Sequence, residues 1–165
     1  MAKEVTVVGL ISDTHGLLRE EALRALEGSD LIIHAGDVGK PEIIDTLKAL
    51  APVVVVRGNI DKGAWGSSLP MTAVAEAGSI WIYVLHDIGQ LEIDPSVAGM
   101  RVVVSGHSHK PNREERSGVL YLNPGSAGPR RFRLPVTVAR LDLRQSLLKV
   151  DFIDLCNGGE QLAIP

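Results

Sequence analysis

The chain has 165 residues, of which 45% are hydrophobic and 22% are charged, a balance that suits one globular domain over residues 1–165. Its formal net charge is −3, so no strong overall field attracts the protein to nucleic acid or to an anionic membrane. These values exclude a highly basic nucleic-acid-binding protein and a disordered acidic chain.

Cysteine content and apolar runs indicate where the protein works. Cys156 is the single cysteine, so no intramolecular disulfide forms, and the first residues lack the charged, apolar and cleavage regions of a signal peptide. The longest apolar runs fall far below the roughly 20 residues of a membrane helix. We therefore expect a cytoplasmic protein outside the membrane. The sequence leaves its oligomeric state open and is compatible with a homo-oligomer.

The first third of the chain predicts alternating strands and helices. A β-branched run ends at Ile11, a second spans residues 31–33 and a third spans 53–56. Such continuous apolar runs are typical of strands buried on both faces. The stretches 17–28 and 41–50 place apolar residues at helical spacing. The expected opening is βαβαβ.

Strands follow one another in the rest of the chain. Residues 72–86 read as a hairpin that turns around 77–79, and a further strand spans 102–104. Residues 136–155 read as another hairpin with its turn near Gln145 and Ser146. This order predicts an α/β fold of two mixed sheets packed face to face, with helices outside.

Polar residues follow these strands at the points where they end. In open α/β sheets, ligands bind outside the carboxyl ends of the strands, so residues far apart in sequence meet there. We expect seven side chains to converge on this rim: Asp13, His15, Asp37, Asn59, His86, His107 and His109.

A metal site explains this cluster better than folding does, because buried charges without partners are costly. Imidazole and oxygen ligands without cysteine suit Mn²⁺, Fe, Zn²⁺, Co²⁺ or Ni²⁺. Seven ligands exceed what one ion ordinarily uses, whereas two ions that share a carboxylate would use them all. Residues two apart on a strand point the same way, so Asp13 with His15, and His107 with His109, can face one site.

Five short motifs carry a family resemblance. "DTH" at 13–15, "GD" at 36–37, "GN" at 58–59, the histidine at 86 and "GHSH" at 106–109 occur in this order. Together they resemble the metallophosphoesterase, or calcineurin-like, superfamily, and "NPGS" at 123–126 resembles its small bacterial and archaeal phosphodiesterase branch. The resemblance implies a four-layer α/β/β/α sandwich.

The resemblance also implies two divalent transition-metal ions, with manganese favoured. One ion would bind Asp13, His15, Asp37 and His109, and the other would bind Asp37, Asn59, His86 and His107, with Asp37 bridging. A hydroxide shared by the ions would attack phosphorus, and Asn59 and His107 would stabilise the added negative charge. The implied activity is hydrolysis of a small phosphate ester, with a phosphodiester favoured.

The sequence departs from the superfamily at two positions. Ile60 stands where many phosphomonoesterases carry a histidine that is thought to protonate the leaving group, and an aliphatic side chain cannot donate a proton. The acid must then be another group or water, or the leaving group must need little help. Asp87 stands where relatives often have glycine, and it either orients a ligand or is solvated.

Several other polar residues have a structural interpretation as well as a functional one. Arg57, Arg130 and Arg131 lie near the rim and could grip a phosphate, although a plain turn explains the last two equally well. His34 reads as a buried histidine that is satisfied by a neighbour. Asp61 is either a partner that supports the ligands or a turn residue.

Two alternatives to a phosphodiesterase remain open. One is a phosphomonoesterase. The other is a protein-binding scaffold similar to the retromer subunit of eukaryotes, which resembles the same small fold; loss of metal ligands would indicate such a scaffold, and here the set is complete.

Overall fold

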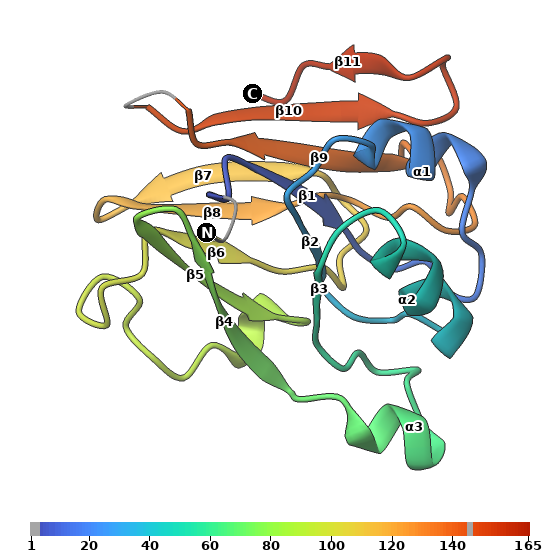
Figure 1. Cartoon of the computed structure of the whole chain (residues 1–165), viewed down its shortest axis with the longest axis horizontal. Coiled ribbons are helices and arrows are strands. Elements are labelled where there is room, and N and C mark those ends of the chain that lie inside the picture. The colour runs from blue at the N-terminus through green and yellow to red at the C-terminus, as the bar shows by residue number, and fades with distance from the viewer. Residues whose placement is uncertain (1–3, 145–146) are drawn as a thin grey trace.

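Two β-sheets packed face to face form the centre of the computed structural model, which describes residues 4–144 and 147–165 (Figure 1). Within these residues, the first sheet has the strand order β11-β10-β9-β1-β2-β3 and the second has the order β4-β5-β6-β8-β7. The strands of the first sheet are β1 (Val7–Ile11), β2 (Leu31–His34), β3 (Val53–Val55), β9 (Thr137–Asp142), β10 (Lys149–Asp154) and β11 (Glu160–Leu162). Those of the second are β4 (Thr72–Ala77), β5 (Ile80–Leu85), β6 (Val102–Val104), β7 (Asn112–Arg116) and β8 (Val119–Asn123).

The predicted βαβαβ opening is confirmed. Helix α1 (Glu20–Leu26) connects β1 to β2, and α2 (Pro41–Lys48) connects β2 to β3. Both connections join parallel strands, and the register aligns Ile11 with His34 and His34 with Val55. Because these three strands are parallel and in step, the loops that follow them leave the sheet at the same edge.

The second sheet brings more strand ends to that edge. Strands β5, β6 and β8 are parallel, whereas β4 and β7 pair antiparallel with their neighbours. The hairpin expected over residues 72–86 is present as β4 and β5, with Ala77 opposite Ile80. The hairpin expected over 136–155 is present as β9 and β10, and its turn near Gln145 and Ser146 lies outside the described residues.

Apolar side chains fill the space between the sheets and the space under the helices. Val8, Leu10 and Ile33 pack between the sheets against Ile82 and Val104. The alternate residues of β1 and β2 point to the other face of the sheet, which α1 and α2 cover. The apolar cluster there includes Ile11, Ala22, Leu26, Ile32, Ile43, Ile44 and Leu47. The period-two pattern of the strands therefore separates two cores.

The outer face of the second sheet has a thinner cover. It carries a small cluster built on Leu85, Val103 and Val119, against which Tyr83, Leu91 and Tyr121 pack. Residues 86–101, the β5–β6 loop, include the 3-10 helix η1 (Ile88–Gln90) and lie on the opposite side of the molecule from α1 and α2 (Figure 1). The α/β sandwich of two mixed sheets is thus confirmed, and this loop takes the place of a helical layer on one side.

Sequence patterns did not indicate several elements of the structure. These are α3 (Gly63–Ser68), the β7–β8 hairpin and β11. Every residue of β7 is exposed, so its side chains show no alternation of apolar and polar. Among the described residues, no helix has the length and apolar character needed to cross a membrane.

Candidate metal centre

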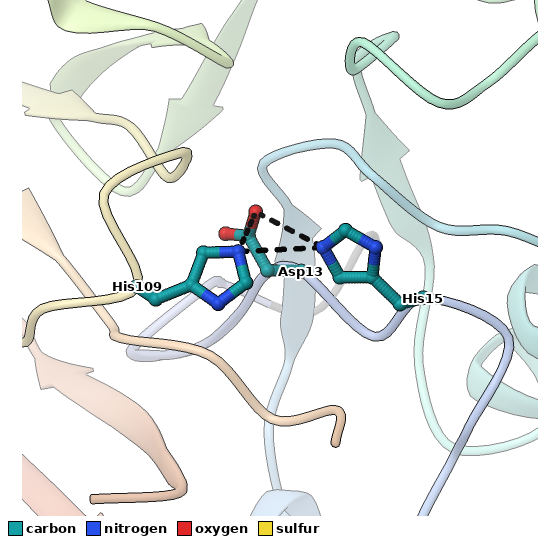
Figure 2. Close-up of side chains that lie close together, drawn as sticks. All are labelled: Asp13, His15 and His109. Atoms are coloured by element: carbon teal, nitrogen blue, oxygen red, sulfur yellow. Dashed lines mark hydrogen bonds and ion pairs between the residues drawn. The ribbon is translucent and has the colours of Figure 1, made fainter. Parts of the chain in front are cut away.

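Five of the seven predicted ligands meet where the parallel strands end. His109 Nε2 lies 3.3 Å from Asp13 Oδ1, and His15 Nε2 lies 3.8 Å from the same oxygen. The Nε2 atoms of His15 and His109 are 3.3 Å apart. Figure 2 shows these three side chains pointing toward one another, Asp13 and His15 from the loop after β1 and His109 from the loop after β6. Donor atoms from distant parts of the chain therefore surround one small space.

Asp37 connects this group to a second one. Its Oδ2 lies 3.5 Å from His15 Nε2 and 3.3 Å from His86 Nε2, while its Oδ1 accepts a hydrogen bond from the Ile60 backbone N–H at 3.0 Å. Two groups of donor atoms fit a metal ion: Asp13 with His15 and His109, and Asp13 with Asp37 and His86. Asp13 belongs to both groups, and one oxygen of Asp37 faces an imidazole of each, His15 and His86.

The chemistry of these donors fits cations. Asp13 Oδ1 and His86 Nε2, which both face the cluster, are buried and have no hydrogen-bond partner within the described part of the chain. His86 Nδ1 donates to the Ala35 carbonyl at 2.7 Å, so Nε2 is the ring nitrogen that faces Asp37. Electron-pair donors that face each other in a buried site repel unless a positive charge lies between them.

Neighbouring groups in the cluster lower the pKa values of both carboxylates, Asp13 and Asp37. Burial raises the pKa of Asp13, but the His109 and His15 imidazoles close to its Oδ1 and the hydrogen bond from Ser12 to its Oδ2 outweigh it and hold that pKa well below its usual range. Burial also opposes ionisation of Asp37, yet contacts with His86 and the Ile60 N–H lower its pKa. Both carboxylates are therefore ionised at neutral pH and can serve as ligands.

The backbone is strained at these positions. Seven non-glycine residues in the described ranges have a positive φ, and five of them are predicted ligands. They are Asp13 (53°), His15 (47°), Asp37 (54°), His107 (70°) and His109 (61°). A left-handed conformation costs a non-glycine residue about 1 kcal/mol or more, and such residues gather at functional sites. The strain turns successive side chains back toward one point.

Close backbone contacts hold the strained turns. Gly58 lies against the backbone and carboxylate of Asp37, and Gly106 lies against the side chains of Ser12 and Asp13, so a Cβ atom has no room at either glycine. The glycines of the "GN" and "GHSH" motifs therefore let the loops after β3 and β6 approach the two carboxylates.

Asp61 fastens two of these loops together. Its Oδ2 accepts backbone N–H groups from Gly58 at 2.9 Å and Val38 at 3.2 Å, and its Oδ1 accepts the Gly39 N–H at 3.0 Å. Three hydrogen bonds to one buried carboxylate tie the loop of Asn59 to the loop of Asp37. Of the two interpretations of Asp61, the supporting role agrees with these contacts.

His34 has a structural environment. Its Nε2–H donates to Thr14 Oγ1 at 3.0 Å, the Thr14 hydroxyl donates to the Val38 carbonyl at 2.8 Å, and the Gly36 N–H donates to His34 Nδ1 at 3.2 Å. Both ring nitrogens are satisfied by the neutral ring, which agrees with the interpretation of a buried histidine held by neighbours.

The remaining two predicted ligands lie beside the cluster. The His107 ring stacks edge-on against His86 with centroids 5.2 Å apart, its side chain is 47% exposed, and its Nε2 lies 4.0 Å from Asp87 Oδ2. Its backbone N–H donates to Asp13 Oδ2 at 3.1 Å. Asn59 is exposed and lines a cavity together with His86. Both residues thus adjoin the His86 side of the cluster.

The three arginines differ in position. Arg57 lines the same cavity as Asn59, and its Nε–H donates to the Asp61 carbonyl at 3.2 Å. Arg130 and Arg131 are exposed, and Arg130 Nε–H donates to the Leu134 carbonyl at 3.2 Å. Arg57 is therefore next to the cluster, while the other two face solvent.

Sequence reasoning missed two groups of residues at the site. Ser12 donates a short hydrogen bond of 2.6 Å to Asp13 Oδ2. Its place in the sequence, a polar residue between the apolar run that ends at Ile11 and the "DTH" motif, was the signal that could have indicated this role. Met71, Leu85 and Leu91 form apolar parts of the cavity beside Asn59. No sequence signal points to them, because the path of the loops brings them there.

Comparisons with known proteins show what the chain is similar to. The calcineurin-like phosphoesterase superfamily domain matches residues 7–146. A curated relative, the "probable metallophosphoesterase" of Methanothermobacter thermautotrophicus, is 35% identical over 149 residues, which cover 82% of this chain and 86% of that protein.

Two solved structures are similar over most of their length. A predicted phosphoesterase from Streptococcus pneumoniae has a TM-score of 0.73 and 28% identity, with 94% of this chain and 92% of that chain covered. Vps29 from Entamoeba histolytica in complex with Zn²⁺ has a TM-score of 0.75 and 26% identity, with 94% and 98% covered.

Proposed function

Because the chain belongs to the calcineurin-like phosphoesterase superfamily, we propose that it is a phosphodiesterase that works with two divalent metal ions. Membership of this family makes a phosphoesterase the coarse assignment, and its dependence on metal ions is part of the proposal. The number of ions, the preference for diesters and the residue roles are the proposal. The observation that carries it is the convergence of Asp13, His15, Asp37, His86 and His109 around buried donor atoms that lack partners.

Each ion has a proposed set of ligands. Asp13, His15, Asp37 and His109 would hold one ion, and Asp37, Asn59, His86 and His107 would hold the other. The position of Asp37 Oδ2 between His15 and His86 supports its sharing. Manganese is the proposed ion, because imidazole and carboxylate ligands without cysteine suit it.

The bound ions would supply hydroxide near neutral pH by lowering the pKa of water, and would neutralise phosphate oxygens. The chain's own residues would do the rest. The exposed Asn59 amide can donate a hydrogen bond to a phosphate oxygen, and the exposed ring of His107 can do the same on the other side of His86. Preorganised donors of this kind stabilise charge that develops in the transition state.

We propose a preference for diesters because the position after Asn59 lacks a proton donor. Ile60 is 42% exposed beside the site and has no proton to give to a leaving group. A good leaving group such as an aryl oxide needs no such proton. Because bis(p-nitrophenyl) phosphate and p-nitrophenyl phosphate release the same aryl oxide, their relative rates measure the preference for a diester independently of the missing acid. We expect the diester to be hydrolysed faster, and the opposite order would favour a phosphomonoesterase.

The test combines metal analysis with activity. The purified protein should contain or take up about two transition-metal ions per chain. A chelator should abolish hydrolysis of bis(p-nitrophenyl) phosphate, and added Mn²⁺ should restore it. Unchanged rates after chelation would contradict the proposal.

The similarity to Vps29 keeps protein binding as a second candidate. Metal content does not separate the two, since the Vps29 structure holds Zn²⁺. Hydrolysis does: a protein that binds metal at this site but cleaves none of a panel of aryl diesters, cyclic nucleotides and monoesters would favour the scaffold.

A further inference from the structure

Two cavities open beside the metal centre, one on each side of the β5–β6 loop. The larger has a volume of about 590 Å³ and reaches Asn59 and His86. Met71, Leu85 and Leu91 form an apolar part of its wall. It therefore begins at candidate ligands and extends along a surface that suits an aromatic or aliphatic group.

The smaller cavity has a volume of about 390 Å³ and reaches His107. Its wall includes Tyr121, whose ring carries the Arg116 guanidinium at 4.2 Å, and Arg116 also pairs with Glu114 at 3.3 Å. Lys110 and Asp87 complete its charged lining, so opposite charges balance. This cavity suits a smaller, uncharged group.

The two cavities meet at one residue. Asp87 lines both, while Ile88 lines the smaller and Gly89 to Leu91 line the larger, so η1 divides them. His86 opens to one side and His107 to the other, and their rings touch edge-on. A phosphate held at the exposed edges of these two histidines would have one cavity on each side.

Core residues make both walls firm. Leu85, Leu91 and Tyr121 belong to the apolar cluster on the outer face of the second sheet. Because packed side chains keep their positions better than solvated loop residues do, the cavities are preformed rather than induced.

We propose that the substrate is a phosphodiester whose two organic arms lie in separate cavities on either side of η1. The larger arm lies against Met71, Leu85 and Leu91, and the smaller arm lies beside Tyr121. This inference rests on the proposed phosphodiesterase function. A monoester has one arm and fills one cavity, so the two classes of substrate must respond differently when a cavity is blocked.

Tryptophan substitutions at exposed wall positions block each cavity. Gln90→Trp fills the larger, and Asn112→Trp fills the smaller. Val97→Trp in the same loop as Gln90, and Arg113→Trp on the opposite side of β7 from Asn112, add the same indole outside both cavities and serve as matched controls. Gln90→Phe and Asn112→Phe replace any tryptophan variant that does not fold.

The Mn²⁺-loaded variants are assayed with bis(p-nitrophenyl) phosphate and p-nitrophenyl phosphate. We expect kcat/KM for the diester to fall about tenfold or more in both blocked variants, whereas the monoester loses activity in one of them. The controls should stay within about twofold of the wild type. A diester that tolerates either blocked cavity, or a monoester that loses activity alike in both, would overturn the inference.

Calorimetric binding of diphenyl phosphate, without turnover, separates this inference from the function on which it rests. If the wild type binds this diester, and both blocked variants bind it more weakly, the two-cavity inference stands even where no ester is hydrolysed. Absence of hydrolysis then contradicts only the proposed function. Equal binding by the wild type and both blocked variants contradicts the inference while leaving hydrolysis to be judged by its own assay.

Discussion

Between the two sheets, side chains such as Val8, Ile82 and Val104 are apolar and belong to regular strands. A few residues further along the same strands, the buried groups are carboxylates and imidazoles on a backbone with positive φ. The interior lowers the free energy of the folded chain by removing apolar surface from water. The rim opposes folding, because it buries charge and strains the backbone. A region that opposes folding and is nevertheless held by many hydrogen bonds is organised for a ligand.

Removing the carboxylate of Asp37, which both ions would share, tests the contrast between rim and interior most strongly. Asp37→Asn should lower hydrolysis of bis(p-nitrophenyl) phosphate by about a thousandfold or more, because several kcal/mol of metal-dependent charge stabilisation are lost. Circular dichroism should show an intact fold. Asp45→Asn, an exposed position on α2, is the control with the same chemical change. An Asp37→Asn variant with wild-type activity would contradict the bridging role.

The second prediction concerns the interior. Leu141 on β9 is fully buried between the sheets, so Leu141→Ala should lower the free energy of unfolding by about 2–5 kcal/mol. Urea titration measures this, and Leu147→Ala at a 76% exposed position should change it by less than about 0.5 kcal/mol. The activity per folded molecule should stay at the wild-type level. A loss of activity without a loss of stability would show that the two regions are not separate.

The third prediction addresses the support of the rim. Asp61→Asn replaces one carboxylate oxygen, which accepts backbone N–H groups, by an amide NH₂ group, which donates. At least one hydrogen bond between the loops of Asp37 and Asn59 is then lost. We expect metal affinity to fall by about 10- to 100-fold, measured by titration with Mn²⁺. Asp94→Asn is a matched control, since exposed Asp94 also accepts two backbone N–H groups. Equal affinities for the two variants would mean that Asp61 is an ordinary turn residue.

The last prediction is a gradual pH dependence of stability. Burial lowers the pKa of His34 from 6.5 to about 4. Between these values the unfolded chain binds a proton that the folded chain does not, so the free energy of unfolding falls as the pH falls, by at most about 1.4 kcal/mol per pH unit. Above pH 6.5 the effect disappears.

Unfolding of the wild type and of His34→Gln, measured across this pH range in the presence of a chelator, isolates the contribution. The variant should be less stable at neutral pH, because the ring's hydrogen bonds to Thr14 and Gly36 change, and its stability should depend less steeply on pH. Parallel pH profiles for the two proteins would assign the dependence to other groups.

The sequence predicted the parts of the molecule that follow local rules. β1 and β2 are continuous apolar runs, and Asp13 and Asp37 follow them directly, so strand and rim position were both readable. Helix α3 contains two glycines and has no apolar periodicity, and β7 is exposed throughout. Neither carries a pattern that distinguishes it from a loop.

The residues that line the cavities could not be predicted from the sequence, for a different reason. Leu91 and Tyr121 are ordinary apolar residues whose position depends on the path of the β5–β6 loop across the second sheet. That path is a tertiary property with no sequence period. Asp61 was ambiguous because a turn aspartate and one that ties two loops together have the same local sequence signature.

The thin cover of the second sheet constrains how this protein can change. Leu85, Leu91 and Tyr121 shield the sheet from water and at the same time line the cavities beside the histidines. Any substitution that reshapes a cavity at these positions also removes packing from beneath the loop. New substrate preferences should therefore evolve through exposed neighbours such as Gln90 and Asn112, or only after stabilising changes elsewhere have accumulated.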